Sequence, residues 1–316
     1  MGVLVVLLGL FALGVWMLYS SANSMMESGL RRRKGIEPEG EKPMMKLEYF
    51  EDNPYYVSSY EFFQNAKFEK LSIVSEDGLA LCANYYKVDG AKNAVIVMPG
   101  WQDTKESFYA YTRMFIDIGL NVLLVDQRAQ GESEGEYNTL GVMETRDMLL
   151  WIKLLKDKGL EGKIVLFGVS MGAATTMMTA STQQDNSIVA CAIEDCGYTS
   201  LEEQAAVYIK TKSPHIPASF GSLMLKLAKP MMKKRAKFNL DDAIPVKHLA
   251  KCKIPMLFIH GKEDTFVPYE MLDRLYSAHP GPKQRLIVEG AEHAVSLYKD
   301  SELYIDTVSK FVNQFI

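Results

Sequence analysis

Short apolar runs alternate with longer amphipathic stretches along most of this chain. Runs of strand length span residues 94–98, 121–125, 163–167, 188–193, 255–259 and 285–288, and helical periodicity covers 107–118, 141–156, 171–181, 269–278 and 303–316. Two earlier runs, 68–75 and 79–88, alternate apolar and polar positions around an Asp77-Gly78 turn typical of a β-hairpin. The pattern predicts an α/β fold with a mostly parallel central sheet, an N-terminal antiparallel hairpin and helices on both faces.

One interval between apolar runs is much longer than the others. About sixty residues separate the fourth run from the fifth, whereas a strand and a helix are usually joined by roughly 2 to 6 residues. Helical periodicity covers 201–212 and 222–237 within this interval, and Pro230 is expected to kink the second helix. We therefore expect a helical lid, at about residues 200–238, inserted over the carboxyl edge of the sheet.

The expected lid is strongly basic. Against the two acidic residues Glu202 and Glu203 it carries eight basic ones, namely Lys210, Lys212, Lys226, Lys229, Lys233, Lys234, Arg235 and Lys237. A solvated helix face explains such a run as readily as contact with anionic lipid does. Because Leu223, Met224 and Met231 are interleaved with these charges, both interpretations stay open.

The first nineteen residues contain no charged side chain. A transmembrane helix needs about 20 apolar residues, so we predict a membrane anchor at 1–20. A juxtamembrane linker that grades into a short amphipathic helix is expected at 21–65. A cleaved signal peptide is the main alternative, since Ser20-Ser21-Ala22 offers small residues near a cleavage site. The basic segment that begins such peptides is missing, which favours the anchor.

A basic cluster, Arg31-Arg32-Arg33-Lys34, follows the predicted anchor. Positive charges close to a transmembrane helix are retained on the cytoplasmic side, so the domain at 66–316 is expected to face the cytoplasm. A secreted or otherwise extracytoplasmic domain is the alternative.

Composition narrows the class of partner. The 35 basic and 39 acidic residues give a net charge of −4, which offers no electrostatic footprint for nucleic acid. The four cysteines, Cys82, Cys191, Cys196 and Cys252, lack the spacing of a metal site. We interpret them as buried free thiols, which favours a reducing compartment. The sequence indicates neither a metal nor an organic cofactor, and small molecules or membrane are the expected partners.

Ser170 stands at the centre of Gly168-Val169-Ser170-Met171-Gly172, between an apolar run and a stretch of small residues. A serine in a sharp strand-to-helix turn projects its hydroxyl out of the backbone, and flanking glycines let neighbouring segments approach closely. An ordinary glycine-flanked turn is the plainer explanation of the pentapeptide alone. The strand before it and the helix after it favour a serine nucleophile.

A serine nucleophile needs a general base, and the base needs an acid that fixes its tautomer. His293 follows the last predicted strand in a loop of small residues and is the expected base, whereas His260 more plausibly packs against or caps its own turn. Asp264 lies in a strand-to-helix loop on the same carboxyl edge and is the expected acid. Asp195, at the end of the preceding strand, is its rival.

The reaction also needs two backbone N–H groups that bind the developing oxyanion. The amide of Met171, directly after the nucleophile, should supply one. The other should come from Trp101 in Pro99-Gly100-Trp101-Gln102, where the tryptophan would also line the substrate pocket. A tight turn with a packed tryptophan is the alternative for this loop.

These pieces resemble the α/β-hydrolase superfamily, particularly its single-domain esterase, lipase and peptidase-like members with an N-terminal membrane anchor. The resemblance covers about residues 68–316. Beside the Ser170 pentapeptide it rests on Asp126-Gln127-Arg128-Ala129-Gln130-Gly131-Glu132-Ser133, on His260-Gly261-x-x-Asp264-x-x-Val267-Pro268 and on the glycine at 290 before His293. Two positions depart from the family: Pro99-Gly100 replaces the usual His-Gly, and Ala129 replaces a common glycine.

The resemblance implies a serine hydrolase that cleaves a carboxylic ester or related acyl bond through an acyl-enzyme on Ser170. Trp101, Tyr198 and Phe266 would line an apolar site for a small-molecule or lipid-like acyl substrate. An acyltransferase or a serine peptidase on the same three residues is an alternative, and so is a binding protein that retains only the fold. The sequence leaves the substrate and the oligomeric state open.

Overall fold

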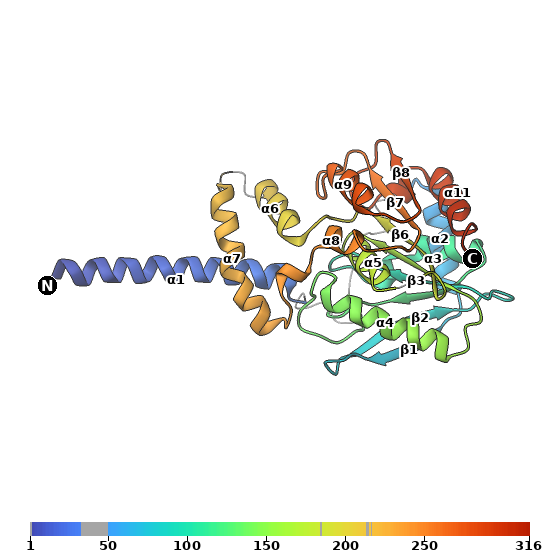
Figure 1. The fold of residues 1–316 in the computed structure, drawn as a ribbon, viewed down its shortest axis with the longest axis horizontal. Helices are drawn as coiled ribbons and strands as arrows, with labels where there is room; N and C mark the ends of the chain where they lie inside the picture. Colours follow the sequence, from blue (N-terminus) through green and yellow to red (C-terminus); the bar gives the residue numbers. More distant parts are fainter. Residues whose placement is uncertain (1, 33–49, 184, 213–214, 216) are drawn as a thin grey trace.

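Eight strands form one central sheet in the computed structural model, which describes residues 2–32, 50–183, 185–212, 215 and 217–316 (Figure 1). The predicted linker at 33–49 lies outside the described residues. The strands are β1 (Glu69–Val74), β2 (Ala80–Tyr86), β3 (Ala94–Met98), β4 (Asn121–Val125), β5 (Ile164–Val169), β6 (Val189–Asp195), β7 (Met256–Gly261) and β8 (Lys283–Val288). Their order across the sheet is β1-β2-β4-β3-β5-β6-β7-β8.

The β1–β2 hairpin forms the antiparallel edge of this sheet. β1 pairs with β2 and β2 with β4 in antiparallel register, whereas all neighbours from β4 to β8 run parallel. Every residue of β3, β4, β5 and β6 is buried, as expected of parallel strands covered on both faces. The predicted α/β-hydrolase fold class is confirmed.

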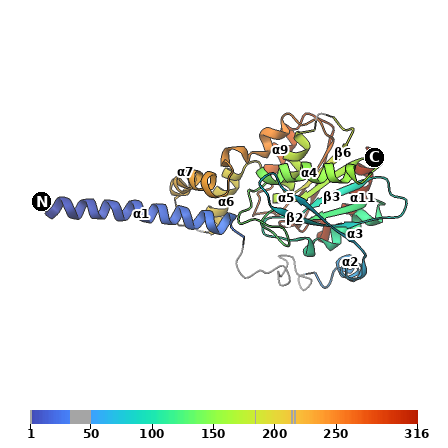
Figure 2. The same cartoon turned by 90° about the horizontal axis from the view of Figure 1, so that it is seen from below.

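Helices cover both faces of the sheet (Figures 1 and 2). Side chains alternate along each strand, so Val95 and Val97 join one apolar core while Ile96 and Met98 join the other. The first core is closed by α2 (Pro54–Asn65), α3 (Tyr109–Asp117), α10 (Ser296–Lys299) and α11 (Ser301–Val312). The second is closed by α4 (Val142–Asp157), α5 (Met171–Ser181), α8 (Pro245–Leu249) and α9 (Glu270–Ala278).

The insertion between β6 and β7 forms the lid. Its helices are α6 (Leu201–Lys212) and α7 (Ala218–Arg235). The bounds of α6 match the prediction, whereas α7 begins before the expected residue 222 and continues past Pro230. Pro230, which was expected to kink the second helix, lies inside α7.

The first helix is longer than the predicted anchor. α1 extends from Gly2 to Leu30 instead of ending near residue 20, so the first part of the expected linker is helical. The segment Val6–Leu30 is long and apolar enough to cross a membrane, and only 6% of an apolar 18-residue window within it is buried, which distinguishes it from a core helix. Ala22, Met26 and Leu30 recur at every fourth position and pack against the lid, which explains why the helix continues.

α1 projects from the domain as a single long rod (Figure 2). Its outer part is exposed, and Figure 1 shows α7 crossing its inner part steeply. α2 is the short amphipathic helix predicted near residue 65, and it places Tyr56 and Phe63 in the first core.

Candidate active site

Ser170 lies at the turn between β5 and α5. Its backbone has φ 55° and ψ −112°, a conformation that L-residues rarely adopt and that stores strain where a side chain must be displayed. A Cβ on Gly168 would lie 2.1 Å from the carbonyl oxygen of Gly172, and a Cβ on Gly172 would lie 2.0 Å from that of Met98. The two glycines are therefore steric requirements of the turn.

The hydroxyl of Ser170 and the side chains of His293 and Asp264 form one hydrogen-bonded series, the Ser170–His293–Asp264 triplet. His293 Nε2 lies 2.9 Å from Ser170 Oγ, and His293 Nδ1 lies 2.7 Å from Asp264 Oδ2. Because a carboxylate only accepts, Nδ1 carries the proton, and Nε2 is left as an acceptor for the serine hydroxyl. The structure thus brings together the three residues that the sequence singled out.

Asp264 is fixed from several sides. Its Oδ1 accepts hydrogen bonds of 2.9 Å from the amides of Phe266 and Val267, and its Oδ2 also lies 3.2 Å from Nε2 of the buried His260. Burial opposes ionisation of this carboxyl, but the hydrogen bonds from His260 and His293 outweigh it and lower the pKa of Asp264 to about 2. The group is a carboxylate throughout the neutral range.

His260 was expected to pack against or to cap its own turn, and it also contacts the carboxylate of Asp264. Its Nε2 donates to the carbonyl of Val267 at 2.9 Å, in addition to the contact with Asp264. Burial disfavours the imidazolium, yet the neighbouring carboxylate of Asp264 raises the pKa of His260 above its usual range. Sequence reasoning missed this contact, although the spacing of four residues between the two side chains hinted at it.

Asp195, the rival acid, is engaged elsewhere. Its side chain accepts a hydrogen bond of 2.8 Å from the hydroxyl of Tyr304, and burial raises its pKa to about 6. Its backbone carbonyl accepts the amide of Ser170 at 2.8 Å. Asp195 therefore helps to hold the turn that displays the serine, while its carboxyl faces the core beside α11.

The loop that carries Trp101 is oriented by two glutamines that the sequence analysis did not single out. Gln127 Nε2 donates to the carbonyl of Pro99 at 2.7 Å, and Gln130 Nε2 donates to that of Gly100 at 3.2 Å. A trans peptide holds its C=O and N–H on opposite sides, so these bonds turn the following amides away from the glutamines. No described residue accepts a hydrogen bond from the amide of Trp101 or Met171.

The motif that contains these glutamines is otherwise structural. Asp126 pairs with the buried Lys105, and its carboxylate accepts the amides of Lys105 and Glu132 at 2.9 Å each. Gly131 has φ +49°, and a Cβ there would lie 2.3 Å from the Asp126 carboxyl. Ala129, at the position where the sequence resemblance leads us to expect a glycine, adopts φ 59°. The motif thus builds a tight loop that supports the glutamines.

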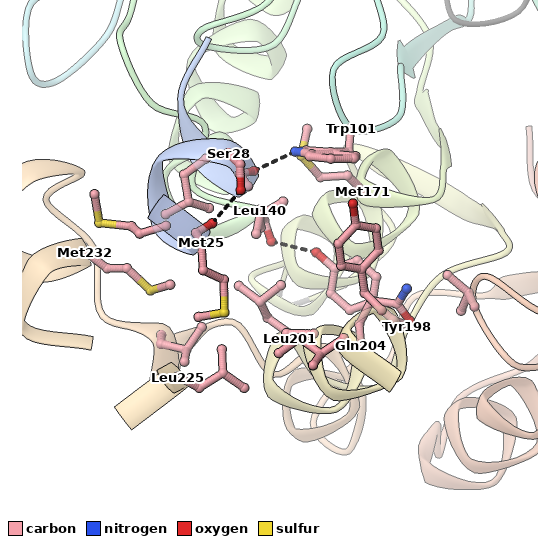
Figure 3. A pocket seen from close by; sticks show the side chains of 18 of the residues that line it. Met25, Ser28, Trp101, Leu140, Met171, Tyr198, Leu201, Gln204, Leu225 and Met232 are labelled. Carbon is pink, nitrogen blue, oxygen red and sulfur yellow. Dashed lines mark hydrogen bonds between the residues drawn. The ribbon is translucent and has the colours of Figure 1, made fainter. Parts of the chain in front are cut away.

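An apolar pocket opens beside Ser170 and Met171 (Figure 3). The three predicted pocket residues, Trp101, Tyr198 and Phe266, all line it. The ring centroid of Phe266 lies 4.8 Å from that of His293, and the hydroxyl of Tyr198 donates to the carbonyl of Leu140 at 2.9 Å. The polar tip of Tyr198 is thereby satisfied, which leaves its ring as an apolar wall.

The remaining walls of the pocket come from the lid and from α1. Leu201 and Gln204 belong to α6, Leu225 and Met232 to α7, and Met25 and Met26 to α1. The side-chain amide of Gln204 donates to the carbonyl of Phe266 at 2.7 Å and so ties the lid to the loop of Asp264. No local sequence signal announced the α1 residues, because they lie in a segment expected to be a linker.

Three potential metal ligands also meet here. The ligand atoms of Cys196, Asp264 and His293 lie within 4.8 Å of one another. Two of them are already joined by a hydrogen bond, and burial raises the pKa of the Cys196 thiol well above its usual value, which disfavours the thiolate that a metal requires. All four cysteines are free thiols, and Cys82 is half-buried whereas the other three are buried as predicted. The three side chains of Cys196, Asp264 and His293 are therefore better suited to proton transfer than to binding a metal ion.

Comparison with known proteins supports this description of the fold. A family model described as serine aminopeptidase, S33, matches residues 89–231. The uncharacterized protein YqkD of Bacillus subtilis (strain 168) is 29% identical over 265 residues, which cover 83% of this chain and 84% of that protein.

Solved structures with the same fold include an esterase and a peptidase. The esterase Pf2001 of Pyrococcus furiosus has a TM-score of 0.65 and 21% identity, and the match covers 79% of this chain and 94% of that one. A puromycin-hydrolyzing peptidase of Mycobacterium tuberculosis has a TM-score of 0.58 and 17% identity, and the match covers 79% of this chain and 39% of that one. At these identities the likeness is one of fold.

Proposed function

We propose that this protein is a serine hydrolase that cleaves a carboxylic ester or a related acyl bond through an acyl-enzyme on Ser170. The observation that carries the proposal is the Ser170–His293–Asp264 triplet, which ends at the wall of an apolar pocket. A serine hydroxyl becomes nucleophilic when a neutral imidazole accepts its proton and a carboxylate orients that imidazole. Each of these conditions corresponds to a hydrogen bond within the triplet.

In the proposed first half-reaction, Ser170 Oγ attacks the acyl carbon while His293 Nε2 takes the hydroxyl proton. The amides of Trp101 and Met171 bind the oxyanion of the tetrahedral intermediate, and each such donor contributes about 10²–10³ in rate. The intermediate collapses, the bond to the leaving oxygen breaks, and His293 returns the proton to the departing alcohol. Asp264 stays ionised and stabilises the imidazolium that forms between the two transfers.

In the second half-reaction a water molecule takes the place of the alcohol. His293 accepts its proton, the resulting tetrahedral intermediate expels Ser170 Oγ, and the free acid leaves with the serine restored. If an alcohol, an amine or a lipid replaced this water, the same steps would make the protein an acyltransferase. Product analysis with and without such acceptors separates the two, because a hydrolase releases free acid in both cases.

A serine peptidase is the second candidate, favoured by the match to the serine aminopeptidase family model. An aminopeptidase must bind a free α-amino group, and a carboxylate is the usual partner for that charge. No aspartate or glutamate is among the described residues that line the pocket. The apolar lining therefore supports an acyl substrate without a charged amine, and parallel assays with p-nitrophenyl esters and aminoacyl p-nitroanilides compare the candidates directly.

We further propose that α1 anchors the protein in a membrane as an uncleaved helix, with the domain on the cytoplasmic side. The exposed apolar surface of α1 supports the anchor, and Arg31 and Arg32 at its end support the orientation. Release of the protein by alkaline carbonate would contradict the anchor. Digestion of the domain by protease added to intact cells would contradict the orientation and favour the extracytoplasmic alternative.

Fluorophosphonate labelling tests the nucleophile. The full-length protein should be labelled and Ser170→Ala should not, whereas Ser28→Ala, which removes a second serine from the same pocket, should keep the label. Labelling that persisted in Ser170→Ala would refute the assignment. A wild-type protein that neither takes up the probe nor hydrolyses any ester would favour a binding protein with a hydrolase fold.

A further inference from the structure

The end of α1 is built into the active-site region. Its residues Met25, Met26, Gly29 and Leu30 line the same pocket as Ser170 (Figure 3). A predicted membrane anchor attached by a flexible tether would make no such contribution. The pocket is incomplete without this helix, because α1 supplies the wall that faces the lid.

Hydrogen bonds from the domain satisfy the carbonyl groups that end α1. The indole N–H of Trp101 donates to the carbonyl of Gly29 at 2.7 Å, and both the amide and the side chain of Asn138 donate to that of Leu30 at 2.8 Å. The last carbonyls of a helix have no partner within the helix, so these donors cap it. Since Trp101 is also the proposed oxyanion residue, α1 is coupled to the loop beside the nucleophile.

Polar side chains hold the same turns of α1 against the lid and the β4–α4 connection. Glu27 accepts hydrogen bonds from Arg235 of α7 at 2.8 Å and from the hydroxyl of Tyr137 at 3.0 Å. Arg235 also donates to the side chain of Asn23 at 2.7 Å. α1 is therefore docked at a defined position by both apolar and polar contacts.

The outer part of α1 has the opposite character. Ten large apolar side chains between residues 6 and 19 are each at least 46% exposed, among them Phe11 at 72% and Trp16 at 62%. Tyr19 is the last of them, and from Tyr19 to Gly29 a helix rises about 15 Å. If the exposed stretch lies in a bilayer, the pocket begins within about that distance of the membrane surface.

The lid lies between this surface and the pocket. α7 crosses α1 steeply in Figure 1, so it would run along the membrane plane when α1 spans the bilayer. On its inner side Leu225 and Met232 line the pocket, whereas Phe220 and Leu223 are 36% and 41% exposed on its outer side. Exposed lysines of α7, including Lys226, accompany them, an arrangement typical of a helix at an anionic lipid surface.

We propose that the inner end of α1 and helix α7 form the wall and the entrance of an acyl-chain site, and that the substrate is an acyl lipid of the bilayer in which α1 is anchored. This inference rests on the proposed serine hydrolase activity and specifies its substrate. The acyl chain lies in the pocket against the wall that α7 and the methionines of α1 form, and so reaches Ser170. Its ester carbonyl then lies beside the loop of Trp101, which the hydrogen bond from the indole of Trp101 to the carbonyl of Gly29 holds in place.

Chain-length selectivity tests the wall. Full-length protein in vesicles that contain an anionic phospholipid is assayed with p-nitrophenyl esters of short and long acyl chains. Met25→Trp places a bulky ring in the pocket and should lower the ratio of long-chain to short-chain turnover at least tenfold. Met17→Trp is the matched control, since it makes the same substitution on the same helix at a position 52% exposed and outside the pocket. An unchanged ratio in Met25→Trp would refute the role of α1.

Delivery from the bilayer needs a second measurement. A fluorogenic acyl glycerolipid is presented either within vesicles or dispersed in detergent, and the ratio of the two rates is taken. The double substitution Phe220→Ser and Leu223→Ser should lower the vesicle-to-detergent ratio at least fivefold. An unaltered ratio, or a wild-type protein that cleaves only soluble esters, would overturn the membrane lipid as substrate.

Active-site labelling separates failure of this inference from failure of the proposed function. If fluorophosphonate labels Ser170 in both the wild-type protein and Met25→Trp while the chain-length ratio is the same in both, the proposed hydrolase activity is retained and the proposed role of α1 in the pocket wall is refuted. If the wild type is not labelled and no ester is hydrolysed, the proposed function itself fails.

Discussion

Nε2 of His260 lies 3.2 Å from Oδ2 of Asp264, the same oxygen that accepts the hydrogen bond from His293. Two imidazoles thus share one carboxylate oxygen, that of His260 fully buried and that of His293 partly exposed. The buried imidazole also donates to the carbonyl of Val267, which anchors its ring. His260 therefore acts as a positioning residue that fixes the acid of the proposed reaction.

Replacing His260 tests this positioning role. His260→Leu removes a donor to a charged, buried acceptor and should lower kcat/KM about 10–100-fold, corresponding to roughly 1.5–3 kcal/mol. His260→Gln, whose amide reaches the position of Nε2, should recover most of that loss. A merely structural role would lower the stability of both variants without separating them in kcat.

The same substitution should change the response to acid. Asp264 has a folded-state pKa of about 2, below its ordinary value near 3.9, so it contributes stability above about pH 4 that is lost as the pH falls towards 2. His260→Leu raises this pKa towards the unfolded value, so the variant loses less stability in acid and the loss is complete at a higher pH. Urea unfolding at several pH values should detect the shift, and identical acid profiles of wild type and variant would contradict it.

The buried Glu194 should make the stability of the protein depend on pH in the opposite direction. Burial raises its pKa to about 8, while nearby His260 and the amide of Gly197, which donates to it at 2.9 Å, oppose the rise. Because the folded pKa exceeds the unfolded value near 4.3, the unfolded chain ionises first, and stability falls as the pH rises from about 4 to 8. Glu194→Gln mimics the protonated group and should gain roughly 2–4 kcal/mol over wild type across this range. Glu76→Gln, at an exposed glutamate, is the control and should show no such divergence.

The fold was predictable because the physical causes lie within each element. Buried parallel strands need continuous apolar runs, and each run from 94 to 259 became a strand in the parallel part of the sheet. The candidate site residues at the carboxyl edge of the sheet could also be predicted from the sequence, since Ser170, Asp264 and His293 each follow a strand in a glycine-containing loop. Strand ends in a parallel sheet converge, so their order along the chain placed them near one another.

The contacts that crossed between distant segments were not predictable. Gln127 and Gln130 hold the carbonyls of a loop some thirty residues away, and nothing in a glutamine's type marks it for that task. The continuation of α1 to Leu30 depends on apolar packing against a lid that follows about two hundred residues later. Such long-range pairing has no period or composition of its own, so it became visible only in the structure.

Gly172 should tolerate no side chain. A Cβ there would lie 2.0 Å from the carbonyl oxygen of Met98, and backbone atoms of β3 cannot move aside cheaply. Gly172→Ala should therefore destabilise the protein by about 3 kcal/mol or more, measured as a lower urea midpoint. Gly100→Ala is the matched control, because its Cβ would find only ordinary contacts at 3.5 and 3.6 Å. Equal midpoints for the two variants would show that the close approach of α5 to β3 is not required.

Ala129 should gain stability when it is replaced by glycine. Its φ of 59° lies in the left-handed region, where a Cβ costs about 1–2 kcal/mol, and its amide is fixed by a hydrogen bond of 2.9 Å to the carbonyl of Glu134. Glycine removes that strain and loses part of the gain to the greater entropy of the unfolded chain, so we expect Ala129→Gly to be more stable by about 0.5–1 kcal/mol. Ala110→Gly, in the first turn of α3 where Ala110 is fully buried, should instead lose about 1 kcal/mol. Urea unfolding of both variants provides the comparison. Destabilisation of both would mean that packing at the buried Ala129 methyl outweighs its backbone strain, since the side chain is only 4% exposed.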